Sequence, residues 1–561
     1  MHSKTRQILE KFEEINKIPR CSKHEEKISI WLQNWAKTAG FDFKFDAVGN
    51  VLIKVPASKG YENSLGLVLQ GHMDMVCEKR KGLKHDFSKD PIECVYAGDW
   101  LKGNGTSIGA DDGIALAIGI VVAESRKTNE IETPPLELLF TVEEETGLTG
   151  ALALEPGFFE GKILLNIDSE EEGIFTIGCA GGKNSRLSLP LKYEHFEYGK
   201  QGFGLFKLSV EGLKGGHSGS EIQKQRANAI KIVARSLELI RKELGPWGFG
   251  LISVFGGRVH NAIPASAEAY FIIELKRTET VEDLLSEFEK TLLKEYAETD
   301  PGLRLKLEKI KETESLEEVK ETESLEDAKE IESLEEKSQN PKENSSYSIP
   351  KNQVLTSKST DKVLNLLLAL PHGVYRMSDK IPGLVETSNN LAVVLTDENE
   401  VKILSSQRSS VMSRLEEISL KLEAVANLAG AKIQHEDSYP AWEMNPESQL
   451  LTRCKEIYTY TFGKDPVIET IHAGLECGVI GSKDSSENPE NAGNSFKNSK
   501  ENPNTKESLE SKESPAIDMI SIGPTIRGNH SPEEKIYIPS IEKIWFFLEN
   551  LLKSYKDGSK Y

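Results

Sequence analysis

Short apolar runs alternate with helical patterns along the first part of the chain, and this alternation restricts the fold more than any other feature. Between Val51 and Asp168 lie the runs LGLVLQ, LELLFTV and KILLNID, and a helix is expected to start near Gly113. Apolar strands that are separated by helices are typical of a largely parallel sheet. The sequence therefore predicts an α/β fold with a mostly parallel sheet.

A second pattern interrupts the first. Downstream, the predicted strands LFKLSVEG, AEAYFIIELK and KILSSQR alternate with long amphipathic helices such as ANAIKIVARSLELIRKEL. After Tyr439 a helix, the strand AIDMISIGP and a last helix, IEKIWFFLENLL, restore the first pattern. We therefore expect a discontinuous first domain, residues 1–186 and 439–561, that is interrupted by an α+β domain, residues 187–438.

Two segments have compositions that do not suit a packed fold. At about 309–350 the chain repeats KETESLEEV, KETESLEDA and KEIESLEEK, and this nine-residue period places the leucines half a turn out of phase on a helix. At about 482–515 Ser, Asn, Pro, Lys and Glu predominate, as in disordered loops. We expect both segments to be insertions that take no part in the chemistry.

The overall charge and the cysteines restrict the class of protein. The formal net charge of -20 disfavours nucleic acid and anionic membranes as partners and favours cations. The longest apolar run, IALAIGIVVA, is about half the length that crosses a bilayer, and the N-terminus lacks the apolar core of a signal peptide. Six cysteines without a CxxC pair indicate neither a disulfide framework nor a thiolate zinc site. We expect a soluble protein of the reducing cytoplasm.

Potential metal ligands follow the predicted strands at their C-terminal ends. LGLVLQ is followed by GHMD, LELLFTV by EEE, LLNI by DSEEEG and AIDMISI by a loop with a histidine, while GADDG opens a helix. The C-terminal ends of parallel strands line one crevice, which is where such sheets bind ligands. We therefore expect the following side chains to converge: His72, Asp111, Glu144 or Glu145, Asp168 and His530.

Imidazoles and carboxylates without thiolate suit zinc, manganese or cobalt in a hydrolytic site, and one carboxylate can bridge two ions. Two ions would neutralise the three adjacent glutamates 143 to 145, so that one is a ligand while its neighbour handles a proton. A bound ion also lowers the pKa of water towards ~7. Asp74 lies two residues after His72 on the same face of an extended segment, where it can orient the imidazole.

Each motif has a plainer interpretation when taken alone. GHMD is compatible with a strand end whose histidine is satisfied by hydrogen bonds, DDG is common at helix starts and turns, and EEE is compatible with a solvated loop. His217 of GGHSG can lie in a glycine turn. The succession of these motifs, four at strand ends and one at a helix start, favours the metal site, because random placement would seldom produce it.

The motifs together resemble those of a known family. GHMDMV, GADDGIALA, FTVEEETGLTGA, NIDSEEEG, GCAGG, GGHSG, HNAIP, VETSNN, IHAGLECG and SIGPTIRGNHSPEE are similar to motifs of the aminoacyl-histidine (cytosolic non-specific) dipeptidases. These belong to the di-zinc peptidases, with carnosinases, tripeptidase T and carboxypeptidase G. The resemblance covers the chain apart from the two low-complexity segments. It implies a catalytic domain interrupted by a lid domain, and a homodimer formed through the lid domains.

The resemblance also implies roles for individual residues. Glu144 would be the general base that takes a proton from the bridging water and passes it to the leaving amine, and Asp74 would orient a ligand histidine. Cobalt or manganese would be able to replace zinc. The implied site contains two zinc ions per subunit, with His72 and Asp168 on one ion, Glu145 and His530 on the other, and Asp111 bridging both.

The lid would supply the groups that hold the substrate. His217 resembles the family histidine that stabilises the developing oxyanion, and Arg408 of SSQRSS is suited to clasp the C-terminal carboxylate. Asn261 of HNAIP resembles a further substrate-binding group. His472 and Gly474 of IHAGLECG would line the substrate pocket, although a buried loop that packs against the sheet explains these two residues equally well.

Three functions remain open at this point. The first is a metal-dependent dipeptidase that hydrolyses unblocked dipeptides, including Xaa-His and β-alanyl-histidine. The second is an amidohydrolase that acts on N-acyl amino acids with the same metal centre. The third is a binding or scaffold protein without catalysis, which is disfavoured because every ligand position and the proposed base are present. The sequence favours the dipeptidase.

Overall fold

The structure is a computed structural model that describes residues 1–196, 202–245, 247–310, 352–379, 381–445, 447–484 and 517–556. Residues 311–350 and 485–515 of the two predicted insertions lie outside these ranges.

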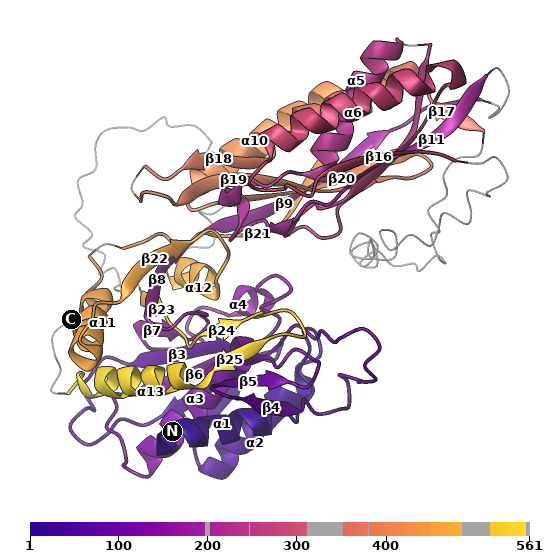
Figure 1. The fold of residues 1–561 in the computed structure, drawn as a ribbon. Coiled ribbons are helices and arrows are strands. Elements are labelled where there is room, and N and C mark those ends of the chain that lie inside the picture. Colours follow the sequence, from indigo (N-terminus) through magenta and orange to yellow (C-terminus); the bar gives the residue numbers. More distant parts are fainter. Residues whose placement is uncertain are drawn as a thin grey trace, which may run out of the picture. The chain divides into compact units, whose positions relative to one another are not determined.

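The chain forms two compact units (Figure 1). The first contains residues 1–179, 442–470 and 475–561, and the second contains residues 180–441 and 471–474. Residues 187 and 438, the predicted limits of the inserted domain, lie within strands β9 (Gly181–Pro190) and β21 (Lys432–Tyr439) of the second unit.

The first unit is built on an eight-stranded sheet. Its four central strands β6, β3, β7 and β23 run parallel, whereas β1 pairs antiparallel with β2, β2 with β6, and β8 with β23. The predicted strands LGLVLQ, LELLFTV, KILLNI and AIDMISI are these four central strands. In spatial order the sheet contains β1 (Asp42–Phe45), β2 (Val51–Val55), β6 (Leu136–Thr141), β3 (Leu67–His72), β7 (Ile163–Asn166), β23 (Asp518–Ser521), β8 (Ile174–Cys179) and β22 (Val467–Ile471).

Helices pack against this sheet and against each other. Helix α3 contacts β3, α1 packs on α3 and α13, and α11 packs on α13. Helix α3 is buried along most of its length because residues 113–123 carry no polar side chain, and its φ and ψ angles become regular only from Gly113, as the sequence predicts. The helices of this unit are α1 (Ser3–Ile15), α2 (Glu26–Ala39), α3 (Ala110–Lys127), α4 (Thr149–Ala153), α11 (Gln449–Phe462), α12 (Glu476–Asp484) and α13 (Ile538–Lys553).

A small antiparallel sheet completes the first unit and carries the C-terminal loop. Its order is β24 (Ile526–Arg527), β25 (Lys535–Tyr537), β5 (Trp100–Gly103) and β4 (Cys94–Ala97). The pairing of β25 with β5 therefore joins the end of the chain to a hairpin that precedes α3.

The second unit is built on a nine-stranded sheet in which neighbouring strands pair antiparallel. Besides β9 and β21 it contains β11 (Phe203–Glu211), β13 (Phe249–Gly256), β15 (Ala267–Glu274), β16 (Arg304–Lys309), β18 (Gly373–Met377), β19 (Val385–Thr396) and β20 (Glu400–Ser409). Two short pairs are β10 (Tyr193–His195) with β17 (Gln353–Leu355) and β12 (Gly216–His217) with β14 (Ala262–Ile263).

Four amphipathic helices cover the second sheet and share one hydrophobic core with it. Helix α5 begins where Asn228 Oδ1 accepts the N–H groups of Ile230 at 2.9 Å and Lys231 at 3.2 Å, the expected N-cap arrangement. These helices are α5 (Ala229–Leu244), α6 (Thr278–Glu295), α9 (Ser357–Ala369) and α10 (Met412–Ala429), and single 3-10 turns occur at Ile222–Lys224 and Leu275–Arg277.

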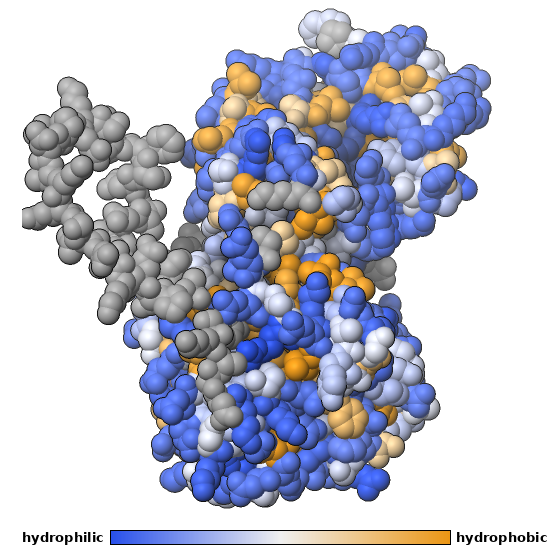
Figure 2. All heavy atoms as spheres, turned by 90° about the vertical axis from the view of Figure 1, so that its left-hand side faces the viewer, coloured by the Kyte–Doolittle hydropathy of each residue, from blue (hydrophilic) through white to orange (hydrophobic). Residues whose placement is uncertain are grey.

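The exposed face in Figure 2 is mostly hydrophilic on both units, in keeping with the excess of acidic residues. Within the described ranges we find no helix with the length and apolar character needed to span a membrane.

Candidate metal centre

The predicted ligands of the first unit lie at the C-terminal ends of adjacent parallel strands. Strand β3 pairs in parallel with β6 on one side and β7 on the other. His72 is the last residue of β3, Glu144 and Glu145 follow the end of β6, and Asp168 follows the end of β7. Because parallel strands end at the same edge of a sheet, the four side chains gather there.

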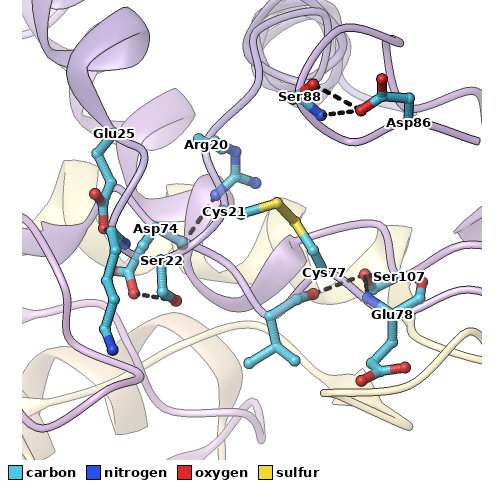
Figure 3. The surroundings of a disulfide bond; sticks show 12 residues. Arg20, Cys21, Ser22, Glu25, Asp74, Cys77, Glu78, Asp86, Ser88 and Ser107 are labelled. Atoms are coloured by element: carbon cyan, nitrogen blue, oxygen red, sulfur yellow. Dashed lines mark hydrogen bonds between the residues drawn. A yellow bond between two sulfur atoms is a disulfide. The ribbon is translucent and has the colours of Figure 1, made fainter. Parts of the chain in front are cut away.

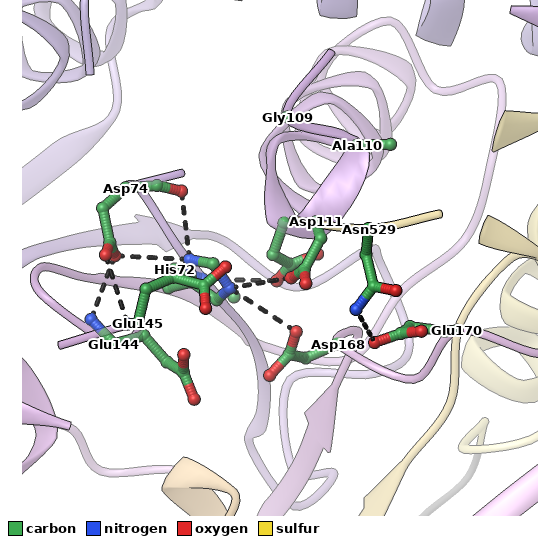
Figure 4. A network of polar contacts seen from close by, with 12 residues as sticks. His72, Asp74, Gly109, Ala110, Asp111, Glu144, Glu145, Asp168, Glu170 and Asn529 are labelled. Carbon is green, nitrogen blue, oxygen red and sulfur yellow. Dashed lines mark hydrogen bonds and ion pairs between the residues drawn. The ribbon is translucent and has the colours of Figure 1, made fainter. Parts of the chain in front are cut away.

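The imidazole of His72 lies at the centre of a network of carboxylates (Figure 4). Its Nε2 is 3.0 Å from Asp111 Oδ1 and 3.6 Å from Asp168 Oδ1. Its Nδ1 is 3.3 Å from Asp74 Oδ1 and 3.1 Å from the main-chain oxygen of Asp74. Since His72 and Asp74 are both buried, Asp74 holds the ring with Nε2 directed at the other two carboxylates.

Asp111 lies between two histidines. While its Oδ1 faces His72, its Oδ2 is 3.2 Å from His530 Nε2. The same His530 nitrogen is 3.0 Å from Glu145 Oε1. One carboxylate therefore connects the end of β3 with the C-terminal loop between β24 and β25, and Glu145 contacts the same loop through His530.

Two groups of potential ligand atoms are compact, with all atoms of a group within 4.8 Å of one another. Nitrogen and carboxylate oxygen donors without sulfur are those that zinc, cobalt and manganese accept, so the residues fit a pair of divalent ions. The groups are His72, Asp111 and Glu145, and His72, Asp112 and Asp168.

Asp112 belongs to the second of these groups of potential ligands, and the sequence analysis did not predict it. The prediction preferred Asp111, and adjacent aspartates in a DDG motif offer no signal that assigns a role to each. In the structure Asp112 is buried, and its Oδ2 accepts the main-chain N–H of His72 at 3.2 Å. Burial raises the pKa of its carboxyl group. Asp112 thus contacts the main chain of β3 as well as lying beside Asp168.

The close packing of acids and imidazoles shifts their pKa values in opposite directions. Burial raises the pKa of Asp168 to about 6 and raises that of Glu144 as well. Although burial opposes it, hydrogen bonding to the two histidines lowers the pKa of Asp111. Burial lowers the pKa of His530, but the hydrogen bonds and negative charges of Asp111 and Glu145 outweigh this effect and raise the pKa to about 11. Positive charge therefore stabilises this cluster, and either protons or divalent ions can supply it.

Asp74 also organises the glutamate turn. Its Oδ1 accepts the N–H of Glu144 at 3.0 Å, and its Oδ2 accepts that of Glu145 at 3.2 Å. Ser22 Oγ donates to the same Oδ2 at 2.8 Å. One buried carboxylate thus fixes the ring of His72 and the main chain of two consecutive glutamates.

The predicted substrate-binding residues all belong to the second unit. His472 Nε2 is 2.7 Å from Ser388 Oγ, and burial lowers the pKa of this imidazole to about 3, with a further contribution from Arg408. Arg408 Nη1 donates to the hydroxyl of Tyr439 at 2.9 Å. A Cβ atom at Gly474 would lie 2.7 Å from the Tyr439 ring, so glycine leaves room for that ring. Arg408, His472 and Gly474 therefore gather around Tyr439 and Ser388.

His217 ends β12, and Asn261 directly precedes β14, with which β12 pairs in the same unit. His217 Nδ1 accepts the N–H of Gly219 at 3.2 Å, and the carbonyl of Asn261 accepts the N–H of Ser218 at 2.7 Å. A Cβ atom at Gly219 would lie 2.7 Å from the carbonyl oxygen of His472. The loops that carry His217, Asn261 and His472 are thus in contact.

A disulfide joins Cys21 to Cys77 and corrects the expectation that the cysteines form none (Figure 3). Their Cα atoms are 5.7 Å apart, and the main chain of Cys21 forms a parallel bridge with Met75. The spacing of 56 residues offered no signal, because packing of the loop after α1 beside the loop after β3 creates the pair. The other four cysteines, Cys94, Cys179, Cys454 and Cys477, form no disulfide in the described part of the chain.

Known proteins resemble the chain over nearly its whole length. It is 36% identical to the cytosol non-specific dipeptidase of Escherichia coli strain K12 over 542 residues, which are 97% of this chain and 96% of that protein. A family model described as a peptidase dimerisation domain of the M20 type matches residues 199–300.

Solved structures also match. The aminoacylhistidine dipeptidase from Vibrio alginolyticus aligns with a TM-score of 0.72 and 33% identity, covering 98% of this chain and 96% of that one. The aminopeptidase PepT from Bacillus cereus shares the fold, with a TM-score of 0.52 at 14% identity and 98% coverage of both chains. These matches confirm the predicted fold class and the predicted family resemblance.

Proposed function

The chain belongs to the M20 peptidases, in the family of the cytosol non-specific dipeptidases, and we propose that it hydrolyses unblocked dipeptides, with Xaa-His and β-alanyl-histidine among its substrates. As a member of this family it is a metal-dependent hydrolase of peptide bonds. The observation that carries the proposal is the position of Asp111 between His72 and His530, with Glu144 on the adjoining turn.

The proposed cofactor is a pair of zinc ions per subunit. When bound, the ions supply positive charge that polarises the substrate carbonyl and acidifies the attacking water. Asp74 contributes by holding His72 in one orientation. The residues that would hold the ions are His72 and Asp168 for one, Glu145 and His530 for the other, and Asp111 for both.

Glu144 is the proposed general base. Its main chain is held by Asp74, while its side chain is placed among acids whose charge, together with burial, raises its pKa. A carboxylate with a raised pKa is a stronger base than an exposed one. Glu144 would take one proton from the attacking water while the oxygen of that water bonds to the peptide carbon. It would then give that proton to the leaving amine as the C–N bond breaks.

The second unit would hold the substrate. Arg408 offers a guanidinium for the C-terminal carboxylate of a dipeptide, a pairing that favours two parallel hydrogen bonds. His217 would donate to the developing oxyanion. Asn261, His472 and Gly474 would shape the pocket, with His472 kept neutral by its burial.

We further propose a cytoplasmic homodimer that forms through the second unit. The match of residues 199–300 to a peptidase dimerisation domain supports the assembly, and the word cytosol in the name of the Escherichia coli relative supports the location. The acidic net charge disfavours nucleic acid and anionic membranes as partners.

Initial rates on a panel of substrates test the proposal. The zinc-loaded protein should hydrolyse free dipeptides, including β-alanyl-histidine, faster than N-acetyl amino acids, and a chelator should abolish the activity until zinc is restored. Faster turnover of the N-acetyl compounds would contradict the dipeptidase assignment in favour of an amidohydrolase. Metal binding without turnover of either class would point to a binding protein.

A further inference from the structure

The turn that leads into Asp111 is held by one buried carboxylate. Glu534, only 2% exposed, accepts four consecutive main-chain N–H groups at 3.0, 2.9, 2.8 and 3.3 Å, those of residues 108, 109, 110 and 111. Its Oε2 receives the first two and its Oε1 the last two. Glu534 lies in the same loop as His530, so these bonds tie the loop of one predicted ligand to the turn of another.

A buried guanidinium holds the same turn from the other side. Arg20, 1% exposed, donates from Nη2 to the carbonyl of Gly109 at 2.6 Å. Its Nη1 donates to the carbonyls of Met73 and Asp74, both at 3.1 Å, directly after His72. Figure 3 shows Arg20 beside Asp74, and Figure 4 shows Gly109 and Ala110 leading to Asp111.

The two glycines of GADDG make room for this guanidinium. Gly109 has a φ of 64°, in the left-handed region that favours glycine, and a Cβ there would collide with Arg20 Nη2. A Cβ at Gly113 would collide with the same atom. The glycines on both sides of Asp111 and Asp112 are therefore needed for the close approach of Arg20 as well as for the turn.

From these contacts we propose that Arg20 and Glu534 are positioning residues that set the separation of His72 and His530 across Asp111. Three loops, distant in sequence, carry these side chains, and the two buried charges join them through main-chain atoms. Burying a guanidinium and a carboxylate is costly unless they are hydrogen-bonded. Both carboxylate oxygens of Glu534 accept main-chain N–H groups, and Nη1 and Nη2 of Arg20 donate to main-chain carbonyls, while Arg20 Nε has no hydrogen-bond partner among the described residues. Arg20 and Glu534 together are called the brace below. The inference rests on the proposed metal site, because the brace would act by spacing the ligands of that site.

Glu534→Gln tests the brace by removing part of it. An amide has one acceptor oxygen and directs its NH₂ at N–H donors, so about half of the four bonds are lost. Mutation of groups that orient metal ligands weakens metal binding by about 10- to 100-fold. We expect that loss in a zinc titration against a chromophoric chelator, an altered visible spectrum of the cobalt-loaded protein, and a similar fall in kcat with KM nearly unchanged. Arg20→Lys should act in the same direction, because an ammonium cannot span three carbonyls.

Glu137→Gln is the matched control. Glu137 is also buried, and its Oε2 accepts the N–H groups of Glu160 and Gly161, both at 2.8 Å, away from the predicted ligands. The Glu137→Gln variant should have a lower melting temperature, but its zinc affinity and the spectrum of its cobalt-loaded form should be unchanged. Wild-type zinc affinity in Glu534→Gln, or an equal loss in Glu137→Gln, would overturn the proposal.

Hydrogen exchange on the wild-type protein keeps the proposal testable if the variants do not fold. The amides of residues 108–111 should be protected in the metal-free protein, because Glu534 already accepts their protons. Rapid exchange that slows only when zinc is added would show that the metal, not the brace, orders the turn. Both measurements use metal binding or exchange rather than turnover. A wrong substrate assignment would thus appear as absent hydrolysis with the brace results intact.

Discussion

His530 Nε2 lies 3.2 Å from Asp111 Oδ2, although 419 residues of sequence separate the two. The contact closes the candidate site with a loop from the end of the chain, while the other oxygen of Asp111 faces His72. A carboxylate between two imidazoles is the arrangement expected of a group that is shared by two cations. The predictions below follow from this geometry and from the buried groups around it.

Asp111→Asn should disrupt both proposed ion sites. Asparagine retains the shape but loses the negative charge that the two cations share, so bound zinc should fall below two ions per subunit. With several kcal/mol of charge stabilisation lost, kcat should fall by about 10²- to 10³-fold. Metal analysis and initial rates measure the two effects. Asp99→Asn, at an exposed position in the same unit, is the control, and a full zinc complement in Asp111→Asn would contradict the shared role.

Glu144→Gln should separate metal binding from catalysis. The amide keeps the turn that Asp74 holds but cannot accept a proton from water, so kcat should drop by about 10²- to 10⁴-fold while zinc content stays the same. Glu143→Gln, the same change one residue earlier, should retain most of the activity. If Glu144→Gln turned over dipeptides at the wild-type rate, Glu144 would not be the base.

Cleavage of the disulfide should destabilise the first unit. A crosslink between Cys21 and Cys77 restricts the unfolded chain, so Cys21→Ser should lower the free energy of unfolding by about 2–4 kcal/mol. Denaturant titration measures this loss, and Cys94→Ser, which removes a free cysteine, should cost less. A thiol count on the denatured, unreduced protein gives an independent check, because six reactive thiols would show that the bond does not form.

The second unit should lose stability in acid through His372. Burial, with a smaller contribution from Lys231, lowers the pKa of its imidazole to about 3, whereas an unfolded histidine has a pKa of ~6.5. The unfolded chain therefore binds a proton first, and the stability contributed by this group is present above pH ~6.5 and is lost as the pH falls towards 3. For this group alone the loss is about 2 kcal/mol between pH 7 and pH 5.

His372→Gln should reduce the dependence of unfolding free energy on pH by that amount, since glutamine does not titrate. Denaturant unfolding of the wild type and the variant at pH 7 and pH 5 measures the difference. His24→Gln, at an exposed position, is the control. Equal pH dependence in His372→Gln and the wild type would mean that the pKa of His372 is the same in the folded and the unfolded protein, which would contradict the prediction.

Local patterns were sufficient to predict the parallel sheet and the places where ligands follow its strands. An apolar run of strand length identifies a buried strand, and parallel strands end at one edge, so His72, Glu144 or Glu145, and Asp168 were predicted together without knowledge of any contact. The sequence order of the motifs also supported the interrupted architecture. Which ion each ligand binds, and the roles of Glu144 and the second-unit residues, stay predictions.

Tertiary structure alone revealed the features that depend on loops meeting across the fold. The Cys21–Cys77 pair, the place of Asp112 beside Asp168, and the contact of Glu534 with the Asp111 turn have no signature in spacing or periodicity. Each arises because main-chain direction in a loop is set by packing and by buried hydrogen bonds, not by the hydrophobic pattern of its residues. The sequence by itself therefore determined which strand ends would bear the chemistry, and the folded chain decided which neighbours hold those groups in place.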